Sequence, residues 1–180
     1  MTAAGRPFAL RVGQGFDIHP FVGAADGGAD TDAGPARPLV LGGVTFDGAH
    51  GLAGHSDADA VAHAVTDALL GAAGLGDIGQ HFPDTDPRWR GADSLDLLAR
   101  AVADLRAAGW VPQNVDTTVV LEAPKLAPRR AEMEKRLSDV VGAPVTVKGK
   151  RAEGLGALGR AEGIACLAVA LVARDPEDPS

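Results

Sequence analysis

Residues 56–74 read SDADAVAHAVTDALLGAAG, and this stretch decides the fold. Ser56 and Asp59 at its start fit a capping box, in which a hydroxyl and a carboxylate satisfy the free amides of a first helical turn. Gly74-Leu75-Gly76 follows it as a stop signal. Between the two signals, apolar residues recur at the spacing of one helical face, at Val61, Val65, Ala68, Leu69 and Ala72. The stretch therefore predicts an amphipathic helix that must bury this face against other elements.

The segments on either side of this helix predict a sheet for it to cover. Residues 8–13 alternate loosely between apolar and polar and indicate a strand that ends at Gly15-Phe16-Asp17. Residues 77–91 read as a loop, because Pro83 and Pro87 block regular structure. The other expected elements are strands at 39–46, 115–121 and 145–148, a helix that Ser94 caps and that runs through Ala108, and a helix at 128–141. Residues 163–174 are apolar enough for either a strand or a helix, and their Ile and Val content favours a strand. This order predicts a two-layer α+β fold, with helices on one face of a mostly antiparallel or mixed sheet.

The chain is expected to form one domain over residues 1–180. Its 180 residues are 46% hydrophobic, which is enough for a single core, and no internal repeat is visible. We expect tails at 1–7 and 175–180. Residues 23–38, rich in Gly, Ala and Asp, are expected to form a flexible surface loop, because they offer too little apolar surface to order themselves.

Composition limits the chemistry that the chain can perform. Cys166 is the only cysteine, so no disulfide can form within the chain, and a metal site would use His, Asp or Glu. It lies in an apolar run and is expected to be inert core rather than a nucleophile.

The net charge of −7 argues against a broad nucleic-acid surface. Met1 to Leu10 lacks a signal-peptide core, and the longest apolar run, 163–173, is shorter than the ~20 residues needed to cross a bilayer. We expect a cytoplasmic protein that binds neither nucleic acid nor membrane.

Asp17-Ile18-His19 is the first candidate site. Alternate residues of an extended segment point to one side, so the carboxylate and the imidazole converge while Ile18 faces the core. His63 on the predicted helix has Asp59 at i−4 and Asp67 at i+4, whose carboxylates are placed to hydrogen-bond its second ring nitrogen. Asp17, His19 and His63 would give three ligands and an open position, the pattern of a catalytic zinc site. The alternative is a turn aspartate, a surface histidine and a satisfied core histidine.

His55-Ser56 is the second candidate site. Free amides and the positive end of the helix dipole make a helix start an anion site, and His55 is placed to donate a hydrogen bond to a phosphate there. Ser56 as a simple cap is the alternative, and the two roles are compatible. Gly13-Gln14-Gly15 begins like a dinucleotide fingerprint, but Ile18 stands where the third glycine belongs.

The order of several motifs resembles a known family. The blocks read GFDIH at 15–19, HSDAD at 55–59 followed by His63, DALLGAA at 67–73, GDIG at 76–79, FPDTD at 82–86, APK at 123–125 and GRAEG at 159–163. Together they resemble the 2-C-methyl-D-erythritol 2,4-cyclodiphosphate synthase family of the non-mevalonate isoprenoid pathway. The resemblance covers nearly the whole chain and omits the N-terminal extension, the 23–38 segment and the tail.

The resemblance implies a phosphorus-oxygen lyase that cyclises 4-diphosphocytidyl-2-C-methyl-D-erythritol 2-phosphate and releases CMP. It implies that Asp17, His19 and His63 bind zinc, and that the segment from Asp17 through Ile18 to His19 borders the substrate. His55 and Ser56 would contact the phosphates, with His55 catalytic. Glu153 would hold a magnesium ion on the diphosphate.

The resemblance also implies where the rest of the substrate lies. Asp77, Ile78 and Gly79 would hold the methylerythritol part, in a pocket lined by Phe82, Pro83, Asp84, Thr85 and Asp86. Ala123, Pro124 and Lys125 would form part of a cytosine pocket. The family is a homotrimer with active sites between subunits, and Phe16 and Arg160 match positions that line its central cavity, which can bind an isoprenoid phosphate.

One segment departs from the family pattern. Where the family usually has Ala-Thr-Thr, this chain has Gly149-Lys150-Arg151, so that Arg151 replaces a threonine expected to assist the transition state. If Lys150 and Arg151 point toward the phosphates, Arg151 becomes a catalytic group. Two rival functions stay open. One is a zinc-dependent phosphohydrolase that uses the same ligands; the other is a catalytically weak trimeric ligand-binding protein.

Overall fold

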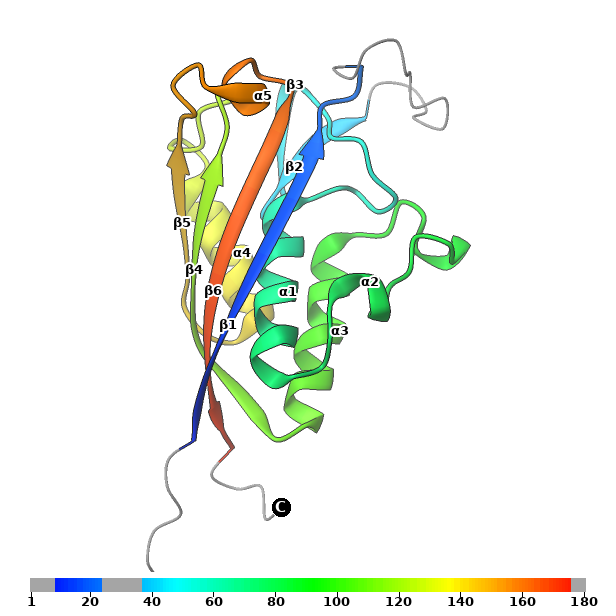
Figure 1. The fold of residues 1–180 in the computed structure, drawn as a ribbon, viewed down its shortest axis with the longest axis vertical. Coiled ribbons are helices and arrows are strands. Elements are labelled where there is room, and N and C mark those ends of the chain that lie inside the picture. The colour runs from blue at the N-terminus through cyan, green and yellow to red at the C-terminus, as the bar shows by residue number, and fades with distance from the viewer. Residues whose placement is uncertain (1–8, 24–36, 176–180) are drawn as a thin grey trace, which may run out of the picture.

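The computed structural model of the protein describes residues 9–23 and 37–175. These residues fold into two layers, a four-stranded sheet and helices packed on one of its faces (Figure 1). The tails predicted at 1–7 and 175–180, apart from Asp175, and most of the loop predicted at 23–38 lie outside the described residues. The predicted two-layer α+β architecture is confirmed.

The sheet is mixed. Its strands follow the order β1 (Leu10–Pro20), β6 (Gly163–Arg174), β4 (Trp110–Val120) and β5 (Val145–Lys150). β6 pairs antiparallel with both β1 and β4, whereas β4 and β5 run parallel. β1, β4 and β5 extend beyond their predicted bounds, because apolar alternation ends before backbone pairing does.

Three helices form the second layer, as the sequence predicts: α1 (Ala60–Ala73), α3 (Ser94–Ala107) and α4 (Arg130–Val141). Figure 1 shows α1 directly behind β1 and β6. Glycines in β1 permit this contact, since a Cβ at Gly13 or Gly15 would lie only 2.0 Å from a carbonyl oxygen of α1. The glycines of β1 therefore set how closely the strand bearing Asp17 and His19 approaches the helix bearing His63.

The starts of two helices differ from the prediction. α1 begins at Ala60 with Asp59 as its N-cap, so the capping box at Ser56 is wrong. α3 is capped by Asp93, and Ser94 is its first residue. In both places two polar residues lie near the helix start, and the aspartate carboxylate is the group that meets the free amides. The predicted stop at Gly74 is confirmed, with a left-handed φ of 74°.

The strand predicted at 39–46 is a hairpin. Its strands β2 (Pro38–Leu41) and β3 (Val44–His50) are joined by Gly42 and Gly43, which have positive φ values of 57° and 71°. Only glycine adopts such angles without strain, so these two residues make the turn. Pro38, predicted to end the loop, begins β2 instead. The structure also contains three short helices that the prediction lacks: α2 (Ile78–His81), η1 (Pro87–Trp89) and α5 (Gly156–Gly159).

Asp59 joins this hairpin to α1. It is fully buried, and its carboxylate accepts hydrogen bonds from the amides of Gly42 at 2.8 Å, Gly43 at 2.6 Å, Val61 at 3.0 Å and Ala62 at 3.1 Å. Burial, followed by the charge of Asp57, raises the pKa of Asp59 to about 6, although the amide bonds act in the opposite direction. One carboxylate thus accepts the hydrogen bonds of backbone amides in the β2–β3 turn and in the first turn of α1.

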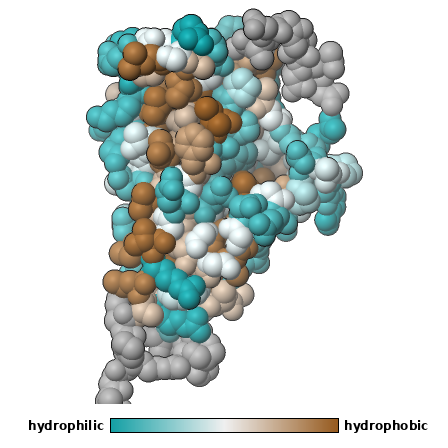
Figure 2. Space-filling model, viewed as in Figure 1, coloured by the Kyte–Doolittle hydropathy of each residue, from teal (hydrophilic) through white to brown (hydrophobic). Residues whose placement is uncertain are grey.

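The sheet face opposite the helices is apolar and exposed. Figure 2 shows apolar side chains gathered along this side of the molecule. Ile18 belongs to this face and is 51% exposed, so the prediction that it faces the core is wrong. The alternation was predicted correctly, but the helices cover the side to which Asp17 and His19 point. The other exposed apolar side chains here are Leu10, Val12, Phe16, Leu167 and Val169. Within the described ranges, no helix has the length and apolar character needed to span a membrane.

Candidate metal centre and adjoining cavities

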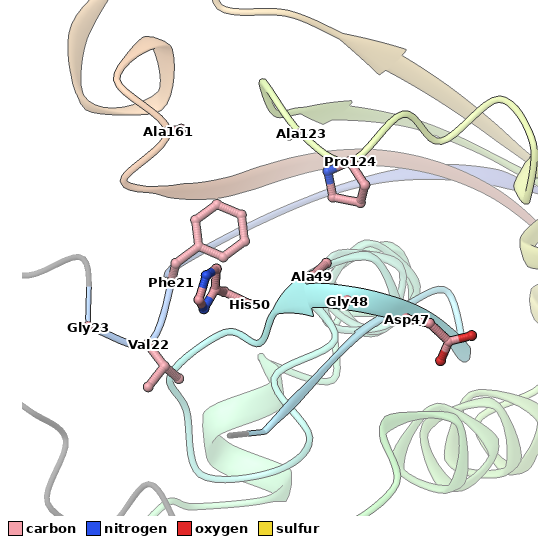
Figure 3. A pocket seen from close by; sticks show the side chains of 10 residues that line it. All are labelled: Phe21, Val22, Gly23, Asp47, Gly48, Ala49, His50, Ala123, Pro124 and Ala161. Carbon is pink, nitrogen blue, oxygen red and sulfur yellow. The ribbon is translucent and has the colours of Figure 1, made fainter. Parts of the chain in front are cut away.

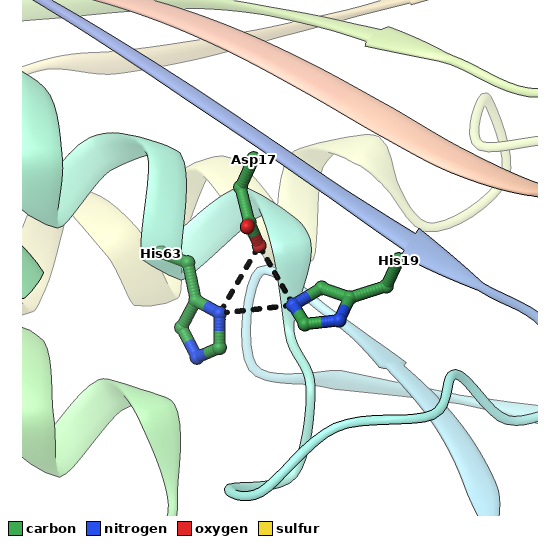
Figure 4. Close-up of side chains that lie close together, drawn as sticks. All are labelled: Asp17, His19 and His63. Atoms are coloured by element: carbon green, nitrogen blue, oxygen red, sulfur yellow. Dashed lines mark hydrogen bonds and ion pairs between the residues drawn. The ribbon is translucent and has the colours of Figure 1, made fainter. Parts of the chain in front are cut away.

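Asp17, His19 and His63 converge on one point (Figure 4). Oδ2 of Asp17 lies 2.9 Å from Nε2 of His19 and 3.1 Å from Nδ1 of His63. The two ring nitrogens lie 3.3 Å apart. Ligand atoms about 2.0–2.1 Å from a zinc ion stand about 3.3 Å apart in a tetrahedron. The three atoms therefore have almost the mutual spacing that one divalent ion requires.

The elements that carry these residues explain the convergence. Asp17 and His19 are alternate residues of β1 and point toward the helix layer, as their pairing opposite Cys166 and Ile164 of β6 fixes. His63 lies in the first turn of α1, whose start Asp59 holds in place. The side chains are 23%, 18% and 11% exposed for Asp17, His19 and His63. The predicted cluster is present and partly accessible.

Hydrogen bonds indicate which ring nitrogen of His19 is available. Its Nδ1 lies 2.8 Å from the carbonyl oxygen of Ala53, which can only accept, so Nδ1 carries the proton and Nε2 has a free lone pair. Burial alone would raise the pKa of Asp17, but hydrogen bonds and positive charge from the two rings, when each is protonated on the nitrogen that faces the carboxylate, hold it far below its usual range. An ionised carboxylate and ring lone pairs that face one another at this distance repel unless a cation or a proton lies between them. The donor set fits a divalent metal ion.

The second nitrogen of His63 has partners other than those predicted. Its Nε2 lies 2.9 Å from the hydroxyl oxygens of both Ser56 and Ser94. Asp59 is engaged by backbone amides, and Asp67 accepts the amide of Ile78 at 2.8 Å, so the expected carboxylate partners are wrong. Burial would lower the pKa of His63, but the hydrogen bond and the charge of Asp17 raise it above its ordinary value.

A cavity of about 470 Å³ opens beside the cluster. It brings together most of the residues predicted around the phosphates and the sugar alcohol, and it adds Gly54, Trp89 and Leu97, which the sequence did not suggest. His55 is placed by a contact of 3.1 Å between its Nε2 and the carbonyl oxygen of Asp86. Ser56 lies four residues before α1, so the anion site expected at the helix start is not formed as predicted. The predicted residues that line the cavity are Asp17, His19, His55, Ser56, His63, Ile78, Gly79, Phe82, Pro83 and Asp84.

Asp77, Thr85 and Asp86 are not among the residues lining this cavity. Asp77 caps α2, and its side chain accepts the amide of Gln80. Asp86 caps η1 and forms a salt bridge with Arg88 at 2.6 Å. These aspartates shape the two short helices that border the cavity.

The residues predicted around cytosine do not line the cavity beside the cluster. Ala123 and Pro124 line a second cavity of about 580 Å³ with Phe21 and His50 (Figure 3). Arg151 is 69% exposed and donates to Glu122 Oε2 from Nε at 2.9 Å and from Nη2 at 2.8 Å. The hydrogen bond from Arg151 holds the pKa of Glu122 below its usual range. Within one chain these residues do not join the cluster of Asp17, His19 and His63.

The neighbouring predicted residues are also at the surface. Lys125, Lys150 and Glu153 are exposed, and Glu153 adopts a positive φ of 52°, a conformation unusual for any residue but glycine. Arg160 is exposed and donates to Glu162 at 2.6 Å.

Fold and site together define a class of small α+β proteins with a three-ligand His and Asp cluster at one end of the sheet and a cavity beside it. The model of the YgbB family matches residues 10–173. The chain belongs to this family.

Named relatives agree with the assignment. The 2-C-methyl-D-erythritol 2,4-cyclodiphosphate synthase of Bordetella petrii is 56% identical over 168 residues, which cover 92% of this chain and 96% of that protein. The synthase of the same name from Burkholderia thailandensis is 50% identical over 169 residues, covering 92% of this chain and 97% of that one.

Solved structures share the fold. The IspF of Plasmodium falciparum, solved as a CDP complex, matches with a TM-score of 0.75 and 30% identity over 93% of this chain and 97% of that one. The bifunctional IspDF of Campylobacter jejuni matches with a TM-score of 0.83 and 37% identity over 95% of this chain. This chain spans 44% of the length of the bifunctional protein.

Proposed function

We propose that this chain is a 2-C-methyl-D-erythritol 2,4-cyclodiphosphate synthase, a phosphorus-oxygen lyase of isoprenoid biosynthesis that works in the cytoplasm. The observation that carries the proposal is the cluster of Asp17, His19 and His63 beside a cavity of about 470 Å³, in a chain 56% identical to a synthase of that name.

The proposed reaction takes place within one substrate molecule. An oxygen of the 2-phosphate of 4-diphosphocytidyl-2-C-methyl-D-erythritol 2-phosphate attacks the β-phosphorus. The bond from that phosphorus to the bridging oxygen breaks, CMP leaves with the bridging oxygen, and an eight-membered ring closes. No water is consumed. Holding both phosphates in one orientation is the main contribution expected of the protein, because ring closure within a molecule depends on geometry.

Asp17, His19 and His63 would hold a zinc ion, and Glu153 would hold a magnesium ion on the diphosphate. Such cations, when bound, neutralise charge on the reacting phosphates. His55 and Ser56 would contact phosphate oxygens, and His55 would stabilise the charge that develops on them. The ring of His55 is already positioned by the carbonyl of Asp86.

The short helices would hold the sugar alcohol. Ile78 and Gly79 would bind the methylerythritol part, with Asp77 as the cap of their helix, and Phe82, Pro83 and Asp84 would line its pocket. Phe82 packs edge to face against Trp89, with ring centroids 5.1 Å apart, so an aromatic wall borders the cavity. This wall would exclude water, which matters because hydrolysis is the competing outcome.

We also infer that the complete site needs a second subunit. Ala123, Pro124 and Lys125, together with Lys150 and Arg151, would bind the cytidine diphosphate part, yet they lie apart from the metal cluster within one chain. A homotrimer would place the cytosine pocket of one subunit against the cluster of its neighbour. The exposed apolar face of the sheet supports such an assembly, since contiguous apolar surface favours association.

The deciding experiment is an assay of CMP release from the authentic substrate, with the product identified by ³¹P NMR in water enriched in ¹⁸O. A cyclic diphosphate without ¹⁸O is expected. A linear product with one ¹⁸O would instead identify a zinc-dependent phosphohydrolase. Tight CDP binding without turnover in the presence of added metal would identify a catalytically weak ligand-binding homologue.

A further inference from the structure

Ser94, the first residue of α3, lies behind the ring of His63 and is only 1% exposed. Its hydroxyl oxygen is 2.9 Å from Nε2 of His63 and 3.3 Å from the hydroxyl oxygen of Ser56. The same hydroxyl donates a short hydrogen bond to Oδ1 of Asp57. The backbone amide of Ser94 donates to Oδ2 of Asp57 at 3.1 Å. Both the main chain and the side chain of Ser94 are therefore held by one carboxylate.

The hydrogen bonds of Ser94 indicate which ring nitrogen of His63 carries the proton. An ionised carboxylate only accepts hydrogen bonds, so the single hydroxyl proton of Ser94 goes to Asp57. The oxygen of Ser94 is then left with lone pairs facing Nε2 of His63. This contact is a hydrogen bond only if Nε2 carries the proton. In the neutral ring the lone pair is then on Nδ1, the atom that faces Asp17 and His19.

We propose that Asp57 and Ser94 are positioning residues that fix the tautomer of His63 and so present its Nδ1 to a divalent cation. The inference rests on the proposed function, because it assumes that the cluster of Asp17, His19 and His63 binds a metal. Histidine ligands commonly donate their other N–H to a fixed acceptor, and loss of that acceptor typically lowers metal affinity about 10- to 100-fold. A serine held by a carboxylate is such an acceptor.

Ser56 does not replace this arrangement. Its hydroxyl oxygen is also 2.9 Å from Nε2 of His63 and accepts the amide of Ala58 at 3.2 Å. In the presence of Ser94, the proton of Ser56 has the oxygen of Ser94 as a nearby acceptor. Without Ser94, that proton is free to point at Nε2 of His63. The ring proton would then move to Nδ1, where it opposes the cation.

The first test reads the tautomer directly. Long-range ¹H–¹⁵N spectra of the metal-free, full-length protein, labelled with ¹⁵N-histidine, distinguish the two ring nitrogens of neutral His63. The proton is expected on Nε2 in the unaltered protein, and partly or wholly on Nδ1 in Ser94→Ala. Observation of the Nδ1–H form in the unaltered protein would overturn the inference, whatever the variants do.

The second test measures affinity for Co²⁺ from its visible absorption, in competition with a chelator. Ser94→Ala and Asp57→Asn should each bind about 10- to 100-fold more weakly. Asp93→Asn is the matched control, because Asp93 precedes Ser94 and caps α3 but does not touch His63; its affinity should not change. Equal Co²⁺ affinity in all four proteins would refute the positioning role and leave the metal site standing. Failure of the unaltered protein to bind Co²⁺ would overturn the site itself, and this inference with it.

Discussion

His63 is the most enclosed of the three ligand candidates, with 11% of its side chain exposed, and it alone comes from the helix layer. Asp17 and His19 share one strand and would stay near each other without it. Loss of the His63 ring would leave two ligands, one fewer than the three protein ligands usual in catalytic zinc sites. The proposed metal centre therefore depends on the ring of His63, the one ligand that joins the helix layer to the sheet.

We predict that His63→Ala loses bound metal and synthase activity together. Metal content by atomic emission and CMP release would be measured on the same purified samples. His50→Ala is the control for metal content alone, since His50 is an exposed histidine at the end of β3, outside the cluster, and lines the second cavity. Stoichiometric metal retained by the His63 variant would contradict the ligand assignment.

The basic residues of the 149–151 segment give a second prediction. Arg151→Ala should lower turnover roughly 10- to 150-fold, because a charged hydrogen bond worth ~1.5–3 kcal/mol is lost at ~1.4 kcal/mol per decade. The guanidinium of Arg151 is held by Glu122, directly before the proposed cytosine residues Ala123 and Pro124, so it would be oriented when the substrate arrives.

The controls for this prediction are Lys150→Ala and Glu153→Ala, each assayed for steady-state CMP release. Glu153→Ala should impair magnesium-dependent turnover however its basic neighbours point. Near-unaltered rates for both basic variants would mean that the segment only connects β5 to α5, since isolated exposed charges contribute little.

Some site residues were predictable from sequence and others were not. Asp17 and His19 followed from strand alternation alone. The partners of His63 did not, because Ser94 lies on a different helix 31 residues further along, and only the fold brings it near. Asp59 and Asp67 had suitable spacing, but backbone amides had already engaged them. Spacing identifies which side chains share a helical face, but it does not reveal which of them are already bonded.

At the scale of elements, Asp59 connects the β2–β3 turn to the start of α1. Its Oδ1 accepts from the amides of Gly42, Val61 and Ala62, and its Oδ2 accepts from Gly43. Each buried amide left without an acceptor costs about 1–3 kcal/mol. The relative placement of hairpin and helix thus depends on one side chain.

We predict that Asp59→Ala lowers the free energy of unfolding by about 3 kcal/mol or more, measured by urea denaturation at fixed protein concentration. Asp59→Asn should lose less, because one amide oxygen can keep the three bonds now made by Oδ1. Asp139→Ala, which removes an exposed aspartate from α4, should change stability by less than about 0.5 kcal/mol. A loss no larger in Asp59→Ala than in Asp139→Ala would show that water replaces the carboxylate.

The elements themselves were largely predictable. The helical period of 56–74 and the stop at Gly74 survive in α1, and the long apolar run at 163–174 is β6. The hairpin was missed because the apolar residues on either side of Gly42-Gly43 read as one strand. Their alternation does not show that the chain turns at the two glycines. Short helices such as α2 and η1 depend on single aspartate caps, a signal too weak to separate them from loop.

For the whole molecule, the outer face of the sheet is the feature that one chain leaves unexplained. Val12 on β1 is 68% exposed and Val169 on β6 is 47% exposed, and both lie on the same face as Phe16 and Ile18. We predict that Val12→Glu dissociates the proposed trimer, because a charge placed in an apolar interface must give up its hydration. Sedimentation velocity would show a shift from trimer to monomer, with the circular dichroism spectrum unchanged.

Ala131→Glu is the matched control. Ala131 is an exposed apolar residue on α4 in the other layer, so the variant adds the same charge away from the sheet face. It should sediment like the unaltered protein. An unaltered protein that is monomeric and fully active would refute both the trimer and a site shared between subunits.

The pairing of β1 with β6 also affects how the molecule is made. Among the described strands, β1 has β6 as its only neighbour in the sheet, and Leu10 pairs with Ala173. During synthesis on a ribosome, the strand bearing Asp17 and His19 emerges early but waits unpaired until the 163–174 segment has been translated. Contacts between such distant parts of a chain form slowly. The side chains of Asp17 and His19 are therefore not fixed in the sheet until the 163–174 segment has been translated.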